Sequence, residues 1–486
     1  MFTGNGYAKS FKLDDVLSRF SFFIKGESSV ATEKKIPSSF IYFFGSFGGI
    51  LFGYDIGVMT GALPFLQSDW NLTNASIVGW ITSAVMFGAI FGGAAAGQLS
   101  DKFGRRKMIL VSAIIFAVFS ILSMVSPNNG QFYLIIVRIL LGLAVGAASA
   151  LVPAYMSEMA PARVRGSLSG LNQTMIVSGM LLSYIMDFFL KDLPEAWGWR
   201  LMLGLAAVPA IILYLGVLRL PESPRFLIKN GKVDQARRVL SYIRNDDEID
   251  GEIKQIQETS SEEKAAYKQS SWASLFSGKY RYLVIAGVGV AAFQQFQGAN
   301  AIFYYIPLIV EKATGNAASS ALLWPIVQGV ILVIGSLVYI AIAEKFKRRT
   351  LLMMGGTVMG LSFLLPSLIN SVVKNANPMM IVVFLSIYVA FYSFTWAPLT
   401  WVLVGEIFPL AIRGRASGLA SSFNWIGSWA VGLLFPVMTA SMSQEAVFAI
   451  FGIICILGVL FIRFRVPETK GLTLEKIEEE GMKHNK

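Results

Sequence analysis

Cysteine, histidine and charge are all scarce in this chain of 486 residues. The single cysteine, Cys455, lies inside an apolar run, which excludes disulfides and thiolate metal sites. The single histidine, His484, lies in a polar tail, which excludes a buried histidine proton relay and a histidine-ligated metal. The sequence also lacks a phosphate-binding GxxxxGKS or GxxxxGKT loop and a nucleophile–base arrangement. We therefore expect no enzyme, no ATP-driven chemistry, no cofactor and no metal.

Charged residues make up 15% of the chain, against about a quarter in an average soluble protein, and 55% of the residues are hydrophobic. Between residues 41 and 464, apolar stretches alternate with short polar joints, and each stretch has the length of about 20 residues that crosses a bilayer. Twelve stretches are centred near Gly49, Phe87, Phe116, Val145, Met175, Ala207, Ala291, Leu332, Gly360, Phe391, Ser428 and Gly452. The pattern predicts an all-α membrane protein with twelve transmembrane helices.

The basic residues of the joints gather on one side of the predicted membrane. Every second joint carries them, at Lys102, Arg105, Arg106, Lys107, Arg163, Arg165, Lys345, Lys347, Arg348, Arg349, Arg413 and Arg415. The alternate joints hold only Lys191, Lys312 and Lys374. By the positive-inside rule this bias places both termini in the cytoplasm, as an even number of spans requires. The net charge of +11 therefore reflects membrane orientation and not nucleic-acid binding.

Composition divides the chain into five segments. We expect a cytoplasmic N-terminal tail (1–36), a six-helix half (37–220), a cytoplasmic linker with amphipathic helices (221–280), a second six-helix half (281–466) and a cytoplasmic C-terminal tail (467–486). The apolar patch of the first tail, residues 20–24, is too short for a signal peptide. Helical spacing in the linker is shown by Val233, Ala236, Val239, Leu240 and Ile243.

Three sequence motifs each occur twice at one common period. Asp101-Lys-Phe-Gly-Arg-Arg106 recurs as Glu344-Lys-Phe-Lys-Arg-Arg349, the run from Glu158 to Gly170 recurs from Glu406 to Gly418, and Pro221-Glu-Ser recurs as Pro467-Glu-Thr. The shared period indicates a six-span unit duplicated in parallel. Duplicated halves are typical of secondary transporters, in which the substrate site lies between the halves and one half rocks on the other.

Each half repeats an acid–arginine spacing at a joint, Glu158 with Arg165 and Glu406 with Arg413. One interpretation is that these arginines only anchor the spans at the lipid headgroups. The duplication favours a second interpretation, in which charge pairs between the halves lock the cytoplasmic side in one state and part in the other.

Charged residues also lie within predicted spans: Asp55 lies midway along the first, and Arg138 lies near the start of the fourth. Ionisable residues in a bilayer are costly and usually functional. The two residues either form a static ion pair that joins their spans or act as a proton switch. In the second case burial favours the protonated acid and the guanidinium favours the carboxylate, so Asp55 binds a proton when Arg138 moves away.

Amide and aromatic side chains gather in the apolar spans. They include Asn172, Gln173, Gln294, Gln295, Gln297, Asn300, Tyr304, Tyr305, Trp396, Trp401, Asn424 and Trp425. A single buried amide more often joins helices than binds a ligand, but so many amides at comparable depth favour a binding site. Amides both donate and accept hydrogen bonds, and aromatic faces suit the C–H faces of a sugar ring. The cluster therefore points to an uncharged polyol as the ligand.

At these residues the sequence resembles the sugar porter family of the major facilitator superfamily, from about residue 36 to 480. The motifs that carry the resemblance include Gly53-Tyr-Asp-Ile-Gly57, Asp101 to Arg106, Pro221-Glu-Ser-Pro-Arg225 and Pro467-Glu-Thr-Lys-Gly471. Within the family it most resembles bacterial proton-coupled xylose, arabinose and galactose symporters. The resemblance implies two six-helix halves with short cytoplasmic helices between them.

The resemblance also implies roles for particular residues. Sugar contacts are implied for Phe52, Gln173, Gln294, Gln295, Asn300, Tyr304, Trp401, Asn424 and Trp425. Proton coupling is implied for Asp55, with Arg138 as its partner; facilitators of the family commonly have Asn at the position of Asp55. A cytoplasmic gate is implied for Arg105, Glu158, Arg165, Arg348, Glu406 and Arg413.

Three residues depart from the family pattern. Leu332 stands where an Asn is usual, so one hydrogen bond to the sugar is expected to be missing. Ala397 stands where a Gly usually precedes Pro398, and Lys347 stands where a Gly is usual in the joint. The first departure bears on the substrate and the other two on the bends that accompany gating.

We therefore expect a proton-coupled symporter of a neutral monosaccharide, a pentose such as D-xylose or a hexose, that works by alternating access. The first alternative is a proton-independent facilitator with a static Asp55–Arg138 pair. The second is a membrane sugar sensor, which the short tails disfavour because such sensors carry long signalling extensions. We expect a monomer in the plasma membrane whose partners are the sugar, the proton and the bilayer, and not nucleic acid.

Overall fold

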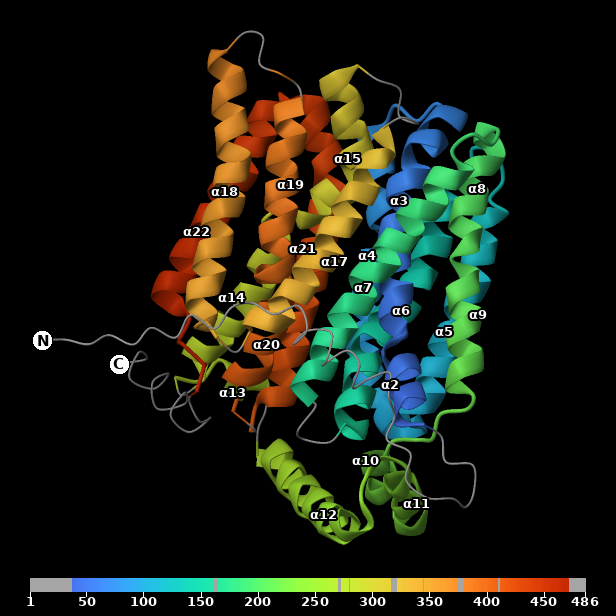
Figure 1. The fold of residues 1–486 in the computed structure, drawn as a ribbon, viewed down its shortest axis with the longest axis vertical. Coiled ribbons are helices and arrows are strands. Elements are labelled where there is room, and N and C mark those ends of the chain that lie inside the picture. Colours follow the sequence, from blue (N-terminus) through green and yellow to red (C-terminus); the bar gives the residue numbers. More distant parts are fainter. Residues whose placement is uncertain are drawn as a thin grey trace, which may run out of the picture.

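All regular structure in the described part of the chain is α-helix. The computed structural model describes residues 37–471 apart from 161–164, 270–271, 279, 316–320, 344, 374–376, 378 and 410. Long helices stand side by side in one bundle, and the helices of the segment that joins the two halves cover one end of it (Figure 1). The prediction of an all-α fold is confirmed.

Six spans form the first half of the bundle. They consist of α2 (Ser38–Ser46) with α3 (Gly48–Asp69), α4 (Ala75–Phe103), α5 (Arg105–Met124), α6 (Gln131–Met159), α7 (Arg165–Leu190), and α8 (Glu195–Leu205) with α9 (Ala207–Val217). Six more form the second half. They consist of α14 (Arg281–Phe296) with α15 (Ala299–Thr314), α17 (Leu323–Ile342), α18 (Arg348–Val372), α19 (Met379–Phe394) with α20 (Trp396–Ile407), α21 (Arg413–Ser441) and α22 (Gln444–Arg465). This is the predicted architecture of two six-helix halves.

Eleven helical segments of the described chain are long and apolar enough to cross a membrane, and each contains one of the predicted centres. The seventh span differs because it is broken into α14 and α15, neither of which is long enough by itself. The break lies at Gly298, whose φ of 92° is in the left-handed region that favours glycine. The Tyr388 hydroxyl donates to the freed carbonyl of Gln297 at 3.0 Å, so the break is stabilised inside the bundle.

The two halves lie side by side, with the first half drawn in blue to green and the second in yellow to red (Figure 1). Three helices of the first half, α3, α4 and α7, pack against α15, α21 and α17 of the second. The outward faces of the bundle carry exposed apolar side chains such as Phe132, Phe189 and Leu368, the kind of surface that lipid chains cover.

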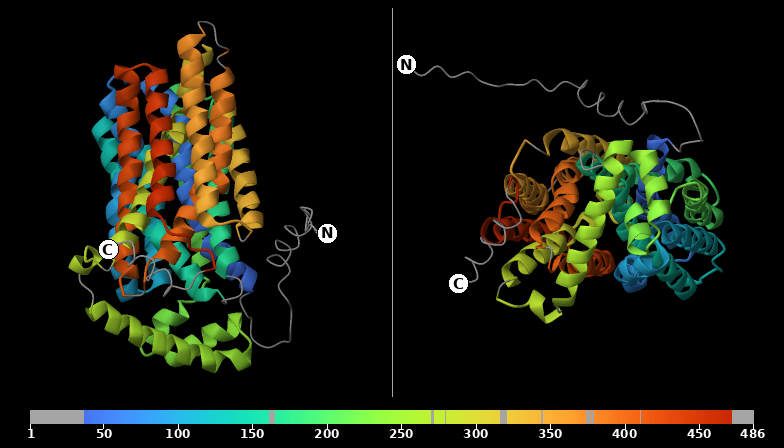
Figure 2. Two further views of the ribbon diagram at one scale, coloured as in Figure 1. Left: turned by 90° about the vertical axis from the view of Figure 1, so that its left-hand side faces the viewer. Right: turned by 90° about the horizontal axis from the view of Figure 1, so that it is seen from below.

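The linker between the halves forms α10 (Pro224–Lys229), α11 (Val233–Ile243), α12 (Asp246–Gln269) and α13 (Trp272–Leu275). Figure 2 shows the linker across the end of the bundle where α6 ends and α21 begins. The predicted apolar face of α11 is buried at Ala236, Val239 and Leu240. Arg244, directly after α11, donates to the carbonyl of Met159 at 3.1 Å and so ties the linker to the end of α6.

Glycines allow α4 and α6 to approach closely within the first half. A Cβ at Gly142 of α6 would lie 2.2 Å from the carbonyl oxygen of Val85, and one at Gly88 of α4 would lie 2.0 Å from that of Ile139. Side chains at these two positions would push the helices apart. Small residues at such crossings are typical of helix packing in membranes.

We predict that Gly142→Val destabilises the bundle, since its side chain overlaps the backbone of α4. Overpacking of this kind costs about 1–3 kcal/mol. Thermal unfolding of the purified protein in detergent measures the effect as a lower melting temperature. Gly97→Val is the matched control on α4, because a Cβ at Gly97 meets nothing within 4 Å. Equal melting temperatures for the two variants would contradict the prediction.

Candidate functional site

A cavity of about 560 Å³ lies between the two halves. Its walls come from α3, α4, α6 and α7 on one side and from α14, α15, α17, α19, α20 and α21 on the other. It extends from Phe303 and Met180 inside the bundle to Met156 and Ser417 near the end covered by the linker helices. We call this end the linker side and the opposite end the outer side. The cavity is therefore accessible along the linker side of the seam between the halves.

The amides predicted to bind a ligand form one hydrogen-bonded network on the cavity wall of the second half. Asn424 Nδ2 donates to the Gln294 side-chain oxygen at 2.6 Å and to the Ala291 carbonyl at 2.9 Å. Gln295 Nε2 donates to the Asn424 side-chain oxygen at 3.3 Å. Asn300 Nδ2 donates to the Gln295 side-chain oxygen at 3.0 Å and also to Ser428. The network holds these side chains in fixed orientations before any ligand binds.

The break in the tenth span anchors the same network. Gln294 Nε2 donates to the carbonyls of Trp396 and Ala397, at 3.1 and 3.0 Å, where α20 begins. Ala397 thus contributes its backbone to the site, although a Gly is usual there. Leu332 also lines the cavity and presents an apolar side chain where the family pattern has an amide.

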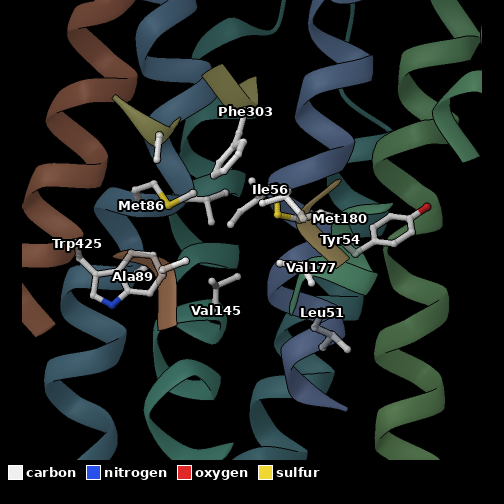
Figure 3. Close-up of a cluster of buried hydrophobic side chains, with 14 of the residues drawn as sticks. Leu51, Tyr54, Ile56, Met86, Ala89, Val145, Val177, Met180, Phe303 and Trp425 are labelled. Atoms are coloured by element: carbon white, nitrogen blue, oxygen red, sulfur yellow. The ribbon is translucent and has the colours of Figure 1, made fainter. Parts of the chain in front are cut away.

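Aromatic side chains and a further amide complete the cavity wall. Phe52 of α3 and Trp425 of α21 meet edge to face across the seam, with ring centroids 5.4 Å apart. Trp401 lines the cavity from the second half, and Gln173 of α7 lines it from the first. Figure 3 shows the apolar surroundings of Trp425, which shares one buried cluster with Ala89 of the first half.

No charged side chain lines the cavity among the residues that the structure describes. Eight of the nine predicted sugar contacts do line it: Phe52, Gln173, Gln294, Gln295, Asn300, Trp401, Asn424 and Trp425. Tyr304 does not. It is buried at 1% exposure, and Asp55, Arg138 and Tyr184 lie within electrostatic range of its hydroxyl.

The predicted charge pair exists inside the first half. Arg138 Nη1 of α6 lies 3.8 Å from Asp55 Oδ1 of α3, and both side chains are almost fully buried. Arg138 also donates to the Ile81 carbonyl at 3.1 Å. Asp55 Oδ2 and Arg138 Nη2 have no hydrogen-bond partner in the described part of the chain, so the pair is only partly satisfied. Asp55 adjoins the cavity through its neighbour Ile56.

Hydrogen bonds between the halves close the seam on the outer side of the cavity. Thr60 donates to the Phe303 carbonyl at 2.6 Å. The hydroxyls of Thr82 and Tyr305 lie 2.5 Å apart across the seam, and within the second half Tyr305 donates to the Gly432 carbonyl at 2.9 Å. The cavity therefore has a closed outer side and an accessible linker side.

The ion pairs described among the predicted gate residues lie within each half. Arg105 contacts Glu158 at 3.2 Å in the first half, and Arg348 contacts Glu406 at 3.5 Å in the second. Arg413 donates to the Phe408 carbonyl at 3.1 Å, and the side chain of Arg165 lies outside the described residues. The sequence predicts charge pairs between the halves that part in one state, and the described pairs do not bridge the halves.

The third duplicated motif, Pro221-Glu-Ser and Pro467-Glu-Thr, supplies residues for which the sequence predicts no role. Glu222 accepts from the backbone N–H of Arg106 at 3.0 Å, and Glu468 accepts from the backbone N–H of Arg348 at 3.0 Å. Each carboxylate thus caps the start of a span, α5 or α18. In addition, Ser223 donates to Glu158, and Thr469 donates to Glu406 at 2.6 Å. The repeat itself was the signal, because paired motifs at one period occupy equivalent places.

A second buried carboxyl, Asp187 of α7, is also absent from the sequence expectations. Its side chain is 1% exposed. It lies in an apolar run of the fifth span, as Asp55 does in the first, so the same criterion of a charge inside a span identifies it.

Comparison with known proteins shows the family to which the fold belongs. The family described as "Sugar (and other) transporter" matches residues 41–480. The chain is 42% identical over 450 residues to a D-xylose transporter of Levilactobacillus brevis, covering 92% of this chain and 96% of the relative. It is 35% identical over 437 residues to an arabinose-proton symporter of Bacillus subtilis, covering 89% and 92%. The solved inward open conformation of the xylose transporter XylE from E. coli superimposes with a TM-score of 0.78 at 30% identity, covering 90% of this chain and 99% of that one.

Proposed function

The chain belongs to the sugar transporter family of the major facilitator superfamily, and from that premise we propose that it is a proton-coupled monosaccharide symporter that works by alternating access. Membership makes it a multi-pass membrane transporter of sugars rather than an enzyme. One observation carries the proposal. The cavity is lined by amide and aromatic side chains, with no charged side chain among the described lining residues, and it lies beside the buried Asp55–Arg138 pair.

The cavity suits a neutral polyhydroxy ligand. An anionic or cationic ligand would require a compensating charge, and none is found among the described lining residues. Gln173, Gln294, Gln295, Asn300 and Asn424 offer donors and acceptors to hydroxyl groups. Phe52, Trp401 and Trp425 offer flat apolar faces to the ring. We assign Tyr304 to the group around Asp55 rather than to direct sugar contact.

Asp55 is the residue to which we assign proton coupling. Its pair with Arg138 is long and leaves one oxygen without a partner, so separation of the two residues disrupts few other contacts. A buried carboxylate that loses its cation is stabilised by binding a proton. A proton gradient supplies about 1.4 kcal/mol per pH unit, and the membrane potential supplies about 2.3 kcal/mol per 100 mV. Together these support several-hundred-fold accumulation for one proton per sugar.

Alternating access requires the two sides of the seam to open in turn. The contacts of Thr60 and Thr82 close the outer side while the linker side is accessible. When the linker side closes, we expect Glu158 and Arg165 to approach Glu406 and Arg413 and form pairs between the halves. We place the linker side in the cytoplasm of a cell whose plasma membrane holds the protein, because the basic joints lie on that side.

A proton-independent facilitator is the second candidate. The observation that favours it is the Asp55–Arg138 pair itself, which also suits a static link between α3 and α6. A facilitator equilibrates its sugar without pH dependence. A symporter instead makes the medium alkaline when sugar is added to energy-depleted cells.

We predict that Asp55→Asn abolishes accumulation and retains exchange. The amide fills the same space but carries no titratable proton, so the ratio of internal to external sugar falls to about one. Uptake of labelled sugar by proteoliposomes with an imposed proton gradient measures this ratio, and counterflow measures exchange. Concentrative, uncoupler-sensitive uptake by the variant would show that Asp55 does not couple the proton.

We also predict that Asn424→Leu weakens sugar binding by about tenfold or more. The substitution removes the central amide of the network and leaves Gln294 and Gln295 with unpaired groups, at a cost of about 1–3 kcal/mol. Equilibrium binding of sugar to the purified protein measures the effect. Ser441→Ala, at the exposed far end of the same helix, is the matched control and should bind as the unaltered protein does. Equal affinities for the two variants would show that the amide network does not contribute to sugar binding.

For the sugar itself we propose D-xylose. The family relative of L. brevis is a D-xylose transporter, and Leu332 removes one potential hydrogen bond from the cavity. A competition panel of pentoses and hexoses against labelled xylose tests the assignment. Xylose should compete most strongly, whereas stronger competition by a hexose would reassign the substrate.

A further inference from the structure

Asp187 of α7 is a buried acid without a cation. Neither of its carboxylate oxygens has a side-chain hydrogen-bond or ion-pair partner among the described residues. The side chain lies against the backbone of Gly61 on α3, where a Cβ would be 2.3 Å from Oδ2. Asp55 has Arg138 to balance its charge, and Asp187 has no such partner in the described structure.

The titratable groups that face Asp187 are phenols, Tyr54 on α3 and Tyr184 on α7. The charged residues on the helices around α7 have other partners: Arg138 pairs with Asp55, Arg200 with Asp69, Glu195 with Ser68, and Lys191 lies over the Phe188 ring. An ionised carboxylate at Asp187 would therefore be uncompensated. Such a charge inside a membrane protein is costly, and the neutral acid avoids the cost.

Contacts that close the outer side lie next to Asp187. Thr60, which adjoins Gly61, donates to Phe303 of the second half. Gly329 of α17 packs against Tyr184, so closely that a Cβ there would lie 3.1 Å from the phenol ring. Both contacts join one half to the other and must part when the cavity opens to the outer side. When these contacts part, water can reach α3 and α7, the two helices whose residues surround Asp187.

We propose that Asp187 is a second proton-binding carboxyl, neutral while the outer side is closed and ionised while it is open. This rests on the proposed alternating access and adds a second pH-sensitive site to the one at Asp55. The closed state binds the proton more tightly than the open state, so a fall in external pH moves molecules from the open to the closed form. A rise in external pH has the opposite effect, by up to about tenfold per pH unit for one group.

A cysteine at the outer seam reports this opening. Ser83 of α4 is fully buried against Gly432 of α21, so Ser83→Cys in a Cys455→Ser background is protected while the outer side is closed. The readout is the rate at which a membrane-impermeant maleimide, added outside, labels the full-length protein in vesicles. Each rate is divided by that of the same reporter carrying Asp187→Asn in the same buffer, which cancels the pH dependence of the thiol. Asp187→Ser provides a second denominator.

The ratio should rise severalfold, and at most about tenfold per unit, as the external pH goes from mildly acid to mildly alkaline. Asp187→Glu should keep the rise, because it retains a titratable carboxyl. A ratio that stays constant over this range, with either denominator, would overturn the proposal. The reporter carrying Asp55→Asn should lose accumulation but keep the rise, so failure of proton coupling at Asp55 and failure of the Asp187 proposal give different results.

Discussion

Polar side chains inside a lipid-covered bundle have no solvent to bond with, and this constraint organises the whole protein. Each must find partners on neighbouring helices or face a water-filled space. Four amides of the cavity wall, Gln294, Gln295, Asn300 and Asn424, meet the constraint by bonding to one another. On the outer side of the seam, Thr60 and Thr82 meet the same constraint by hydrogen bonding to Phe303 and Tyr305. The described polar groups that could bind a ligand are therefore concentrated where the two halves meet, whereas the outward faces carry exposed apolar side chains such as Phe132 and Leu368.

Duplication gives each half its own rigid linker-side end. Glu222 and Glu468 cap the first turns of α5 and α18, and Arg105 and Arg348 hold the neighbouring acids Glu158 and Glu406. Because these bonds stay within one half, they survive a rocking motion of one half against the other. The bonds across the seam are the ones that such a motion must exchange, and those described on the outer side join neutral groups.

The two buried acids, Asp55 and Asp187, differ in how their negative charge is compensated. Asp55 is compensated by Arg138 at 3.8 Å, whereas Asp187 lies among phenols and backbone. A paired acid responds to the movement of its cation, and an unpaired acid responds to the arrival of water. Under the two proposals the acids therefore respond to different parts of the transport cycle, Asp55 beside the cavity and Asp187 at the outer side.

The sequence by itself determined the span count, the parallel duplication and the residues that gather at the cavity. Span length and apolarity depend only on local composition, and the motif period is read directly from the sequence. Eight of the nine amides and aromatics expected at the cavity do line it. Only the tertiary structure decided that the seventh span breaks at Gly298 and that Tyr304 lies away from the cavity. It also showed that the described gate pairs lie within each half. Which side of a helix faces the seam, and which side of the seam is closed, depend on the packing of distant segments and leave no local signal.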